Sequence, residues 1–143
     1  MTMNVFTTLE LMTAGLWLGS IVFFSFFLAP VLFRVLAAAD AARVVRALFP
    51  RYYLLGIVCG LILCLLLILR WDGLRLAVVA FLTLIDLYCR QSLTPRINEA
   101  RDAGPMRQTE FDRMHRLSVQ LNGVVMLGLI GFFLWAVIQK PPM

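Results

Sequence analysis

The sequence contains little charge. Only 15% of its 143 residues are charged, whereas 62% are hydrophobic. A soluble domain of this size needs many more polar residues to cover its surface. A lipid bilayer, by contrast, solvates apolar side chains directly and requires only that backbone polar groups be hydrogen-bonded within the protein, as they are in helices. The composition therefore excludes an ordinary soluble fold and predicts membrane-spanning helices.

Residues that build metal, disulfide and catalytic sites are also scarce. The chain has one His and three Cys, and Cys59, Cys64 and Cys89 form no C-x-x-C pair. This spacing matches no zinc, haem or disulfide framework, so we interpret the cysteines as small packing residues and predict no metal and no cofactor. No Ser/His/Asp order, P-loop or dinucleotide glycine motif is present, which argues against an enzyme.

The net charge of +5 does not indicate nucleic-acid binding. The basic residues stand at the ends of apolar runs instead of forming one polar face. Anionic lipid headgroups are the partner that this distribution favours. The first apolar run follows no basic residue and is too long for a signal-peptide core, so we predict that it is retained as a membrane span.

Long uncharged stretches define three of four predicted spans. Leu11–Phe33, Tyr52–Leu69 and Leu117–Ile138 are each long enough to cross a hydrocarbon core of roughly 30 Å. The third span in chain order is the weakest, because it reaches full length only by including Asp86 and Arg90. We predict an all-α membrane protein, a single four-transmembrane-helix antiparallel bundle over residues 1–143, with spans at about 9–35, 51–70, 74–94 and 113–139.

The connections between spans carry turn and helix signals. In the first, Asp40 as an N-cap and the alternation of Arg with apolar residues predict a short amphipathic interfacial helix at Asp40–Leu48, with Pro50 in the first turn of the next helix. Asp72-Gly73 predicts a tight turn. Residues 95–105, bounded by two prolines, are polar and predict an irregular connection.

The basic residues divide unequally between the two sides of this topology. Three lie on the side of the termini: Arg70, Arg75 and Lys140. Ten lie on the other: Arg34, Arg43, Arg46, Arg51, Arg90, Arg96, Arg101, Arg107, Arg113 and Arg116. Because positive residues remain cytoplasmic, both termini are predicted to lie outside the cytoplasm.

Polar residues recur at helical spacing in the last two spans. Thr83, Asp86, Arg90 and Thr94 share one face of the third span, and His115, Ser118 and Asn122 share one face of the fourth. Asp86 and Asn122 lie at similar depth. A carboxylate in hydrocarbon costs roughly 2.5 to 3.5 kcal/mol, so Asp86 needs a partner, and Arg90 at i+4 is the predicted one.

These residues predict a cytoplasm-facing polar site. Its candidate members are Asp86, Arg90, His115, Ser118, Asn122, Arg51, Tyr52 and Tyr53. The competing interpretation is that the polar residues only hold the helices in register.

Other residues have simpler interpretations. The G-x-x-x-G pairs Gly15/Gly19 and Gly56/Gly60 predict close helix packing inside the bundle. Glu10 is interpreted as lying near the outer surface, within reach of the headgroups.

Several segments resemble a known family. Gly15–Ser20 with Pro30, Leu48–Tyr53, Thr94–Asn98, and Phe111–Ser118 with Asn122 resemble the bacterial DUF4149 family and, more distantly, eukaryotic transmembrane protein 205. The resemblance extends over nearly the whole chain. It implies a four-span membrane protein of unassigned activity, and suggests transport or trafficking through the relative's link to platinum-drug resistance and vesicular export. Taken with the arginine distribution, we expect a multi-pass protein of the bacterial inner membrane with both termini periplasmic.

Two classes of function remain open from the sequence. The first is small-molecule or ion handling, export or stress resistance through the polar site, in a protein that is a homo-oligomer or works within a larger complex. The second is a structural accessory subunit that packs against a larger membrane complex. A wet pocket is expected for the first class and a dry polar face for the second.

Overall fold

A computed structural model describes residues 5–138 without the Val137 side chain, and this part of the protein consists of helices joined by short turns. Lys140 and the predicted end of the fourth span at residue 139 lie outside it. The elements are α1 (Val5–Val22), η1 (Phe23–Leu28), α2 (Ala29–Val35), α3 (Ala38–Leu69), α4 (Gly73–Tyr88), η2 (Cys89–Leu93), α5 (Thr94–Asp102), η3 (Gly104–Arg107) and α6 (Gln108–Ile138). Here η1 and η2 are π-helical and η3 is a 3-10 helix.

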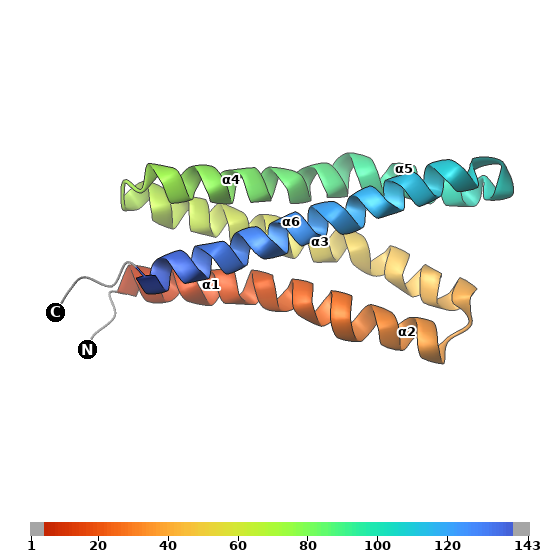
Figure 1. Ribbon diagram of the computed structural model, residues 1–143, viewed down its shortest axis with the longest axis horizontal. Coiled ribbons are helices and arrows are strands. Elements are labelled where there is room, and N and C mark those ends of the chain that lie inside the picture. Colours follow the sequence, from red (N-terminus) through yellow and green to blue (C-terminus); the bar gives the residue numbers. More distant parts are fainter. Residues whose placement is uncertain (1–4, 139–143) are drawn as a thin grey trace.

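These elements join into four long helical rods. The rods are Val5–Val35, Ala38–Leu69, Gly73–Asp102 and Gly104–Ala136, and each is long and apolar enough to cross a membrane. Figure 1 shows them side by side, with the start of α1 and the end of α6 at one end of the molecule. We call this the terminal end, and the opposite end, which holds α2 and α5, the basic end. Helix α3 packs against α1 and α4, and α6 packs against the same two helices.

The outer surface of the rods is apolar. Phe23, Phe26 and Phe27 are each about 60% exposed, and Leu127 is 65% exposed. The buried core is a narrow strip between the rods that includes Trp17, Leu63 and Val125. Large apolar side chains turned outward from long helices are stable in lipid and not in water. The protein is therefore an integral membrane protein.

Two of the four rods contain a π-helical segment that ends two residues before a proline. Segment η1 precedes Pro30 and η2 precedes Pro95. A proline in a helix donates no hydrogen bond, and its ring crowds the carbonyl four residues earlier. Those carbonyls belong to Phe26 and Gln91, inside the two π segments, where the wider turn provides room. Both rods therefore continue beyond their prolines.

The start of α3 differs from the prediction. Residues 40–48 are helical, but they do not form a separate helix that ends before Pro50, because α3 runs through Pro50 without a break. An ion pair between Arg46 and Asp102, 2.9 Å long, ties this part of α3 to α5. The expected irregular connection after Pro95 is also wrong, since α5 occupies Thr94–Asp102.

The tight turn predicted at Asp72-Gly73 is confirmed. The N–H of Trp71 donates to Ile68 O at 3.0 Å and that of Asp72 to Leu67 O at 3.1 Å, which closes α3 with a Schellman motif. Trp71 has φ of 57° and is 94% exposed. The Asp72 side chain then caps α4 by accepting from the Arg75 backbone N–H at 3.0 Å.

Trp71 occupies a left-handed position that a glycine adopts without steric cost. We expect Trp71→Gly to be more stable than Trp71→Ala by about 1 kcal/mol, because alanine keeps the Cβ that is strained in this conformation. Both variants lose the same exposed ring, so their difference isolates the backbone. Thermal unfolding of the two in one detergent measures it, and equal stability would show that Trp71 is not held in this conformation.

Candidate functional site

A cavity of about 490 Å³ lies between the rods towards the basic end. Segments η1 and α2 form one side of it, and α3, α5 and α6 form the others. Its wall includes Phe24, Ser25, Ala29, Phe33, Ala42, Arg46, Phe49, Tyr52, Tyr53, Ile97, Arg101, Phe111, His115, Ser118 and Asn122. Aliphatic and aromatic side chains together make up most of this wall, and its polar groups lie in an inner set and at a rim.

Aromatic rings form the main wall of the cavity. The centroid of Phe24 lies 4.9 Å from that of Tyr52 and 5.2 Å from that of Phe49. Tyr53 stacks on Phe49 at 5.8 Å and meets Tyr52 edge-on at 5.1 Å. Such tilted and edge-on pairs stabilise one another beyond the area that they bury. The wall is thus a packed aromatic surface and not a set of isolated rings.

A chain of hydrogen bonds crosses the inner part of the cavity. The Tyr52 hydroxyl donates to Asn122 Oδ1, and Asn122 Nδ2 donates to Ser25 Oγ at 3.2 Å. These residues belong to α3, α6 and η1, so the chain joins three rods. Ser118 bonds within its own helix, to the His115 carbonyl at 2.8 Å. Asn122 is consequently held with a fixed orientation at the cavity wall.

Two guanidinium groups and an imidazole stand on the rim. Arg46 forms its ion pair with Asp102, and Arg101 lies over the Phe111 ring with its Cζ 5.3 Å from the centroid. The His115 ring stacks on the same Phe111 ring, with the two centroids 5.7 Å apart. The rim is therefore basic, whereas the wall behind it is aromatic.

The structure brings five of the eight predicted site residues to this cavity. They are Tyr52, Tyr53, His115, Ser118 and Asn122. Arg51 is exposed and donates to the Ala47 carbonyl at 2.9 Å. Asp86 and Arg90 are not among the lining residues either.

The predicted Asp86–Arg90 pair is wrong. Asp86 is 3% exposed and accepts a hydrogen bond from Trp17 Nε1 at 3.1 Å, while Arg90 Nε donates to the Pro50 carbonyl at 3.2 Å. The prediction assumed a regular α-helix, in which residues four apart share a face. A π-helical segment begins at Cys89 and changes that spacing.

The two glycine pairs have different surroundings. A Cβ at Gly56 would lie 1.9 Å from Asp86 Oδ2, and one at Gly60 would lie 2.0 Å from Thr83 Oγ1. Gly56 and Gly60 therefore allow the close approach of α3 to α4. A Cβ at Gly15 would make ordinary contact with Phe133 at 3.6 Å, and one at Gly19 would meet nothing within 4 Å.

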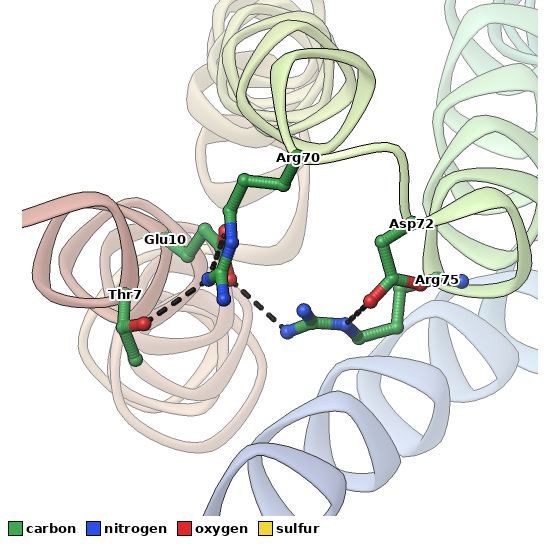
Figure 2. A network of polar contacts seen from close by, with 5 residues as sticks. All are labelled: Thr7, Glu10, Arg70, Asp72 and Arg75. Atoms are coloured by element: carbon green, nitrogen blue, oxygen red, sulfur yellow. Dashed lines mark hydrogen bonds and ion pairs between the residues drawn. The ribbon is translucent and has the colours of Figure 1, made fainter. Parts of the chain in front are cut away.

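A charge cluster at the terminal end was missed by the sequence analysis (Figure 2). The expectation that Glu10 lies near the outer surface is wrong, because this residue is 0% exposed. Its carboxylate pairs with Arg70 at 2.9 Å and with Arg75 at 3.1 Å. Arg70 also donates to Thr7 Oγ1 at 3.0 Å, and Arg75 pairs with Asp72 at 2.7 Å. The sequence did contain an indication of this cluster, since Glu10 stands at the start of the first span and therefore at the same depth as the arginines on either side of the Asp72 turn.

The cluster depends on the charge of its carboxylates. Partial burial acts to raise the pKa of Asp72, but the backbone and side-chain hydrogen bonds from Arg75 outweigh it and hold the pKa below its usual range. A carboxyl whose pKa is lower in the folded state stabilises the fold at neutral pH, and that stabilisation is lost as the pH falls.

Comparison with known proteins places the chain in a family. The family described as "Domain of unknown function (DUF4149)" matches residues 12–105. The chain belongs to the DUF4149 family. The match ends before α6, so the resemblance of Phe111–Ser118 and Asn122 lies outside it.

A relative of this DUF4149 protein carries no assigned activity. It is an uncharacterized protein of Aquifex aeolicus (strain VF5), 50% identical over 50 residues, which cover 35% of this chain and 36% of the relative. The matched stretch thus spans about a third of the relative's length. No solved structure matches the chain. The geometry of the site is therefore the basis for any functional proposal.

We expect Glu10→Gln to destabilise the protein by roughly 3 kcal/mol, because it leaves Arg70 and Arg75 without their shared carboxylate. The control is Asp40→Asn, whose partner Arg43 lies 3.4 Å away with 81% of its side chain exposed, and which should change stability by less than about 1 kcal/mol. Thermal unfolding in detergent measures both. Equal effects would mean that the buried cluster contributes no more than an exposed pair.

Proposed function

We propose that this DUF4149 protein binds amphipathic small molecules with an acidic head at the cytoplasmic face of the bacterial inner membrane, as part of their handling or export. The observation that carries the proposal is the combination of an aromatic cavity wall with a basic rim formed by Arg46 and Arg101. Binding by such a site requires no metal or covalent chemistry. The function is accordingly one of recognition and movement of a ligand.

The dimensions and chemistry of the cavity support a small amphiphile. Its volume of about 490 Å³ falls within the usual range of small-molecule sites, roughly 300 to 1,000 Å³. Phe24, Phe49 and Tyr52 offer rings to an apolar body. Guanidinium groups bind carboxylates and phosphates through paired hydrogen bonds, so the rim favours an acidic head.

The membrane orientation in this proposal follows from the distribution of arginine. The four rods cross the bilayer antiparallel to one another, the basic end is cytoplasmic, and both termini are periplasmic. The first part of α3, around Asp40–Leu48, lies at the cytoplasmic interface, where its arginines meet anionic headgroups. The cavity then faces the inner leaflet, from which an amphiphile enters sideways with its head at the rim.

Reporter fusions test this orientation. We expect a phosphatase that is active only outside the cytoplasm to be active when fused after Met143 and inactive when fused after Ala103. The physical reason is the retention of the arginine-rich connections in the cytoplasm. A reporter that is active only inside the cytoplasm, fused at the same two positions, is the control. The reverse pattern at both positions would contradict the proposed orientation.

A photoreactive fatty acid tests the cavity. We expect a diazirine-bearing palmitic acid to label cavity residues of the detergent-solubilised protein, and Ala42→Phe, which fills the cavity, to reduce that labelling about tenfold or more. Ala77→Phe, on the exposed face of α4, is the matched control and should leave it unchanged. Mass spectrometry of the labelled peptides gives the measurement.

The head group has its own test. Arg46→Gln combined with Arg101→Gln should weaken labelling by the acid but not by the corresponding alcohol, because only the acid pairs with the rim. Labelling that is equal in all variants, or confined to lipid-facing residues, would contradict a cavity function. That outcome would favour the alternative function, a structural accessory subunit. The larger complex to which the subunit belongs would then be sought among the proteins that co-purify with it in mild detergent.

A further inference from the structure

Asp86 has an unusual position for a carboxyl group. It lies in α4, within the candidate span Gly73–Asp102, and is 3% exposed. Its hydrogen-bond donor is the indole N–H of Trp17, 3.1 Å away, which is neutral. The carboxyl also abuts Gly56, where a Cβ would lie 1.9 Å from Oδ2. A buried acid therefore meets one neutral donor and closely packed backbone.

In the described part of the chain, the groups that interact with Asp86 carry no positive charge. The titratable groups on which Asp86 acts electrostatically are Tyr52 and Tyr53 from α3 and Cys89 from η2. From α1 it meets Trp17, and α6 packs on α4 where Gly128 meets Leu82. Arg90, the nearest arginine in sequence, donates to the Pro50 carbonyl. Among residues 5–138, no ion pair involves Asp86.

Glu10 provides the comparison within the same molecule. It is equally buried, but two guanidinium groups lie 2.9 and 3.1 Å from its carboxylate oxygens. Those contacts offset the cost of removing a negative charge from water. No cation among residues 5–138 compensates Asp86 in this way, and an ionised carboxylate in a membrane span without a cation is strongly disfavoured. The neutral acid avoids this cost.

We propose that Asp86 is a proton-binding site, in which the carboxylate takes up one proton from water and holds it as the neutral acid inside the bundle. Protonation converts the carboxylate to a carboxylic acid, which both accepts from Trp17 and offers one donor. Tyr52 interacts electrostatically with Asp86 and also lines the cavity, so the cavity is the side from which we expect water to reach the site. The proposal stands independently of any ligand in the cavity.

Infrared spectroscopy of the full-length protein in detergent at neutral pH tests the protonation state. We expect a carbonyl band of a protonated carboxyl that shifts in heavy water, is lost in Asp86→Asn and is retained in Asp86→Glu and Glu10→Gln. Asparagine has nearly the same shape as the neutral acid, so Asp86→Asn should also remain folded. Absence of the band from the wild-type protein, or its persistence in Asp86→Asn, would overturn the proposal.

Carbodiimide labelling of the wild-type protein identifies which carboxyl group carries the proton, and it needs no substitution. A hydrophobic carbodiimide takes up the proton of a neutral carboxylic acid, and the carboxylate then adds to its central carbon and rearranges to a stable N-acylurea. We expect this adduct on the peptide that contains Asp86 and not on the one that contains Glu10, with less of it at alkaline pH. Adducts of equal yield on both peptides would reject the distinction between the two acids.

Discussion

The doubly paired carboxylate of Glu10 is the interaction on which the arrangement of the rods depends. It joins α1 to the end of α3 and the start of α4 at one point, because Arg70 and Arg75 flank the turn between those helices. Gly56 and Gly60 then keep α3 close to α4 along their length. Towards the basic end the rods are joined by side-chain hydrogen bonds, aromatic contacts and the more exposed Arg46–Asp102 ion pair, and there the cavity forms. The helices are thus held together by a buried ion-pair cluster at the terminal end, and they enclose a cavity towards the basic end.

Hydropathy and turn chemistry predicted the helical class and the Asp72-Gly73 turn, because both depend on local sequence and on the solvent. The continuity of α3 through Pro50 and the existence of α5 were not predictable in this way. Arg46 and Asp102 are far apart in sequence, and their ion pair stabilises a helical start that proline alone would disfavour. The partners of Glu10 are equally distant, so only their common depth in the bundle could have indicated them.

The candidate site shows where spacing arguments hold. His115, Ser118 and Asn122 line one cavity as expected, because α6 is a regular α-helix from Gln108 to Ile138. The same argument failed for Asp86 and Arg90, because η2 interrupts the periodicity. Trp17 had no pattern to mark it as the partner of Asp86. A buried tryptophan is usually explained by packing, and its N–H becomes informative only when its acceptor is known.

The two π segments also set the direction in which the side chains that follow them point around the helix axis. A π turn contains one residue more than an α turn, and one residue corresponds to about 100° of rotation around a helix axis. Phe33 in α2 and Ile97 in α5 line the cavity beyond η1 and η2 respectively. Had both rods been uninterrupted α-helices of the same sequence, these side chains would be turned to another quadrant. Which side chains line the cavity therefore depends on the one additional residue that each π turn contains, in each of the two rods.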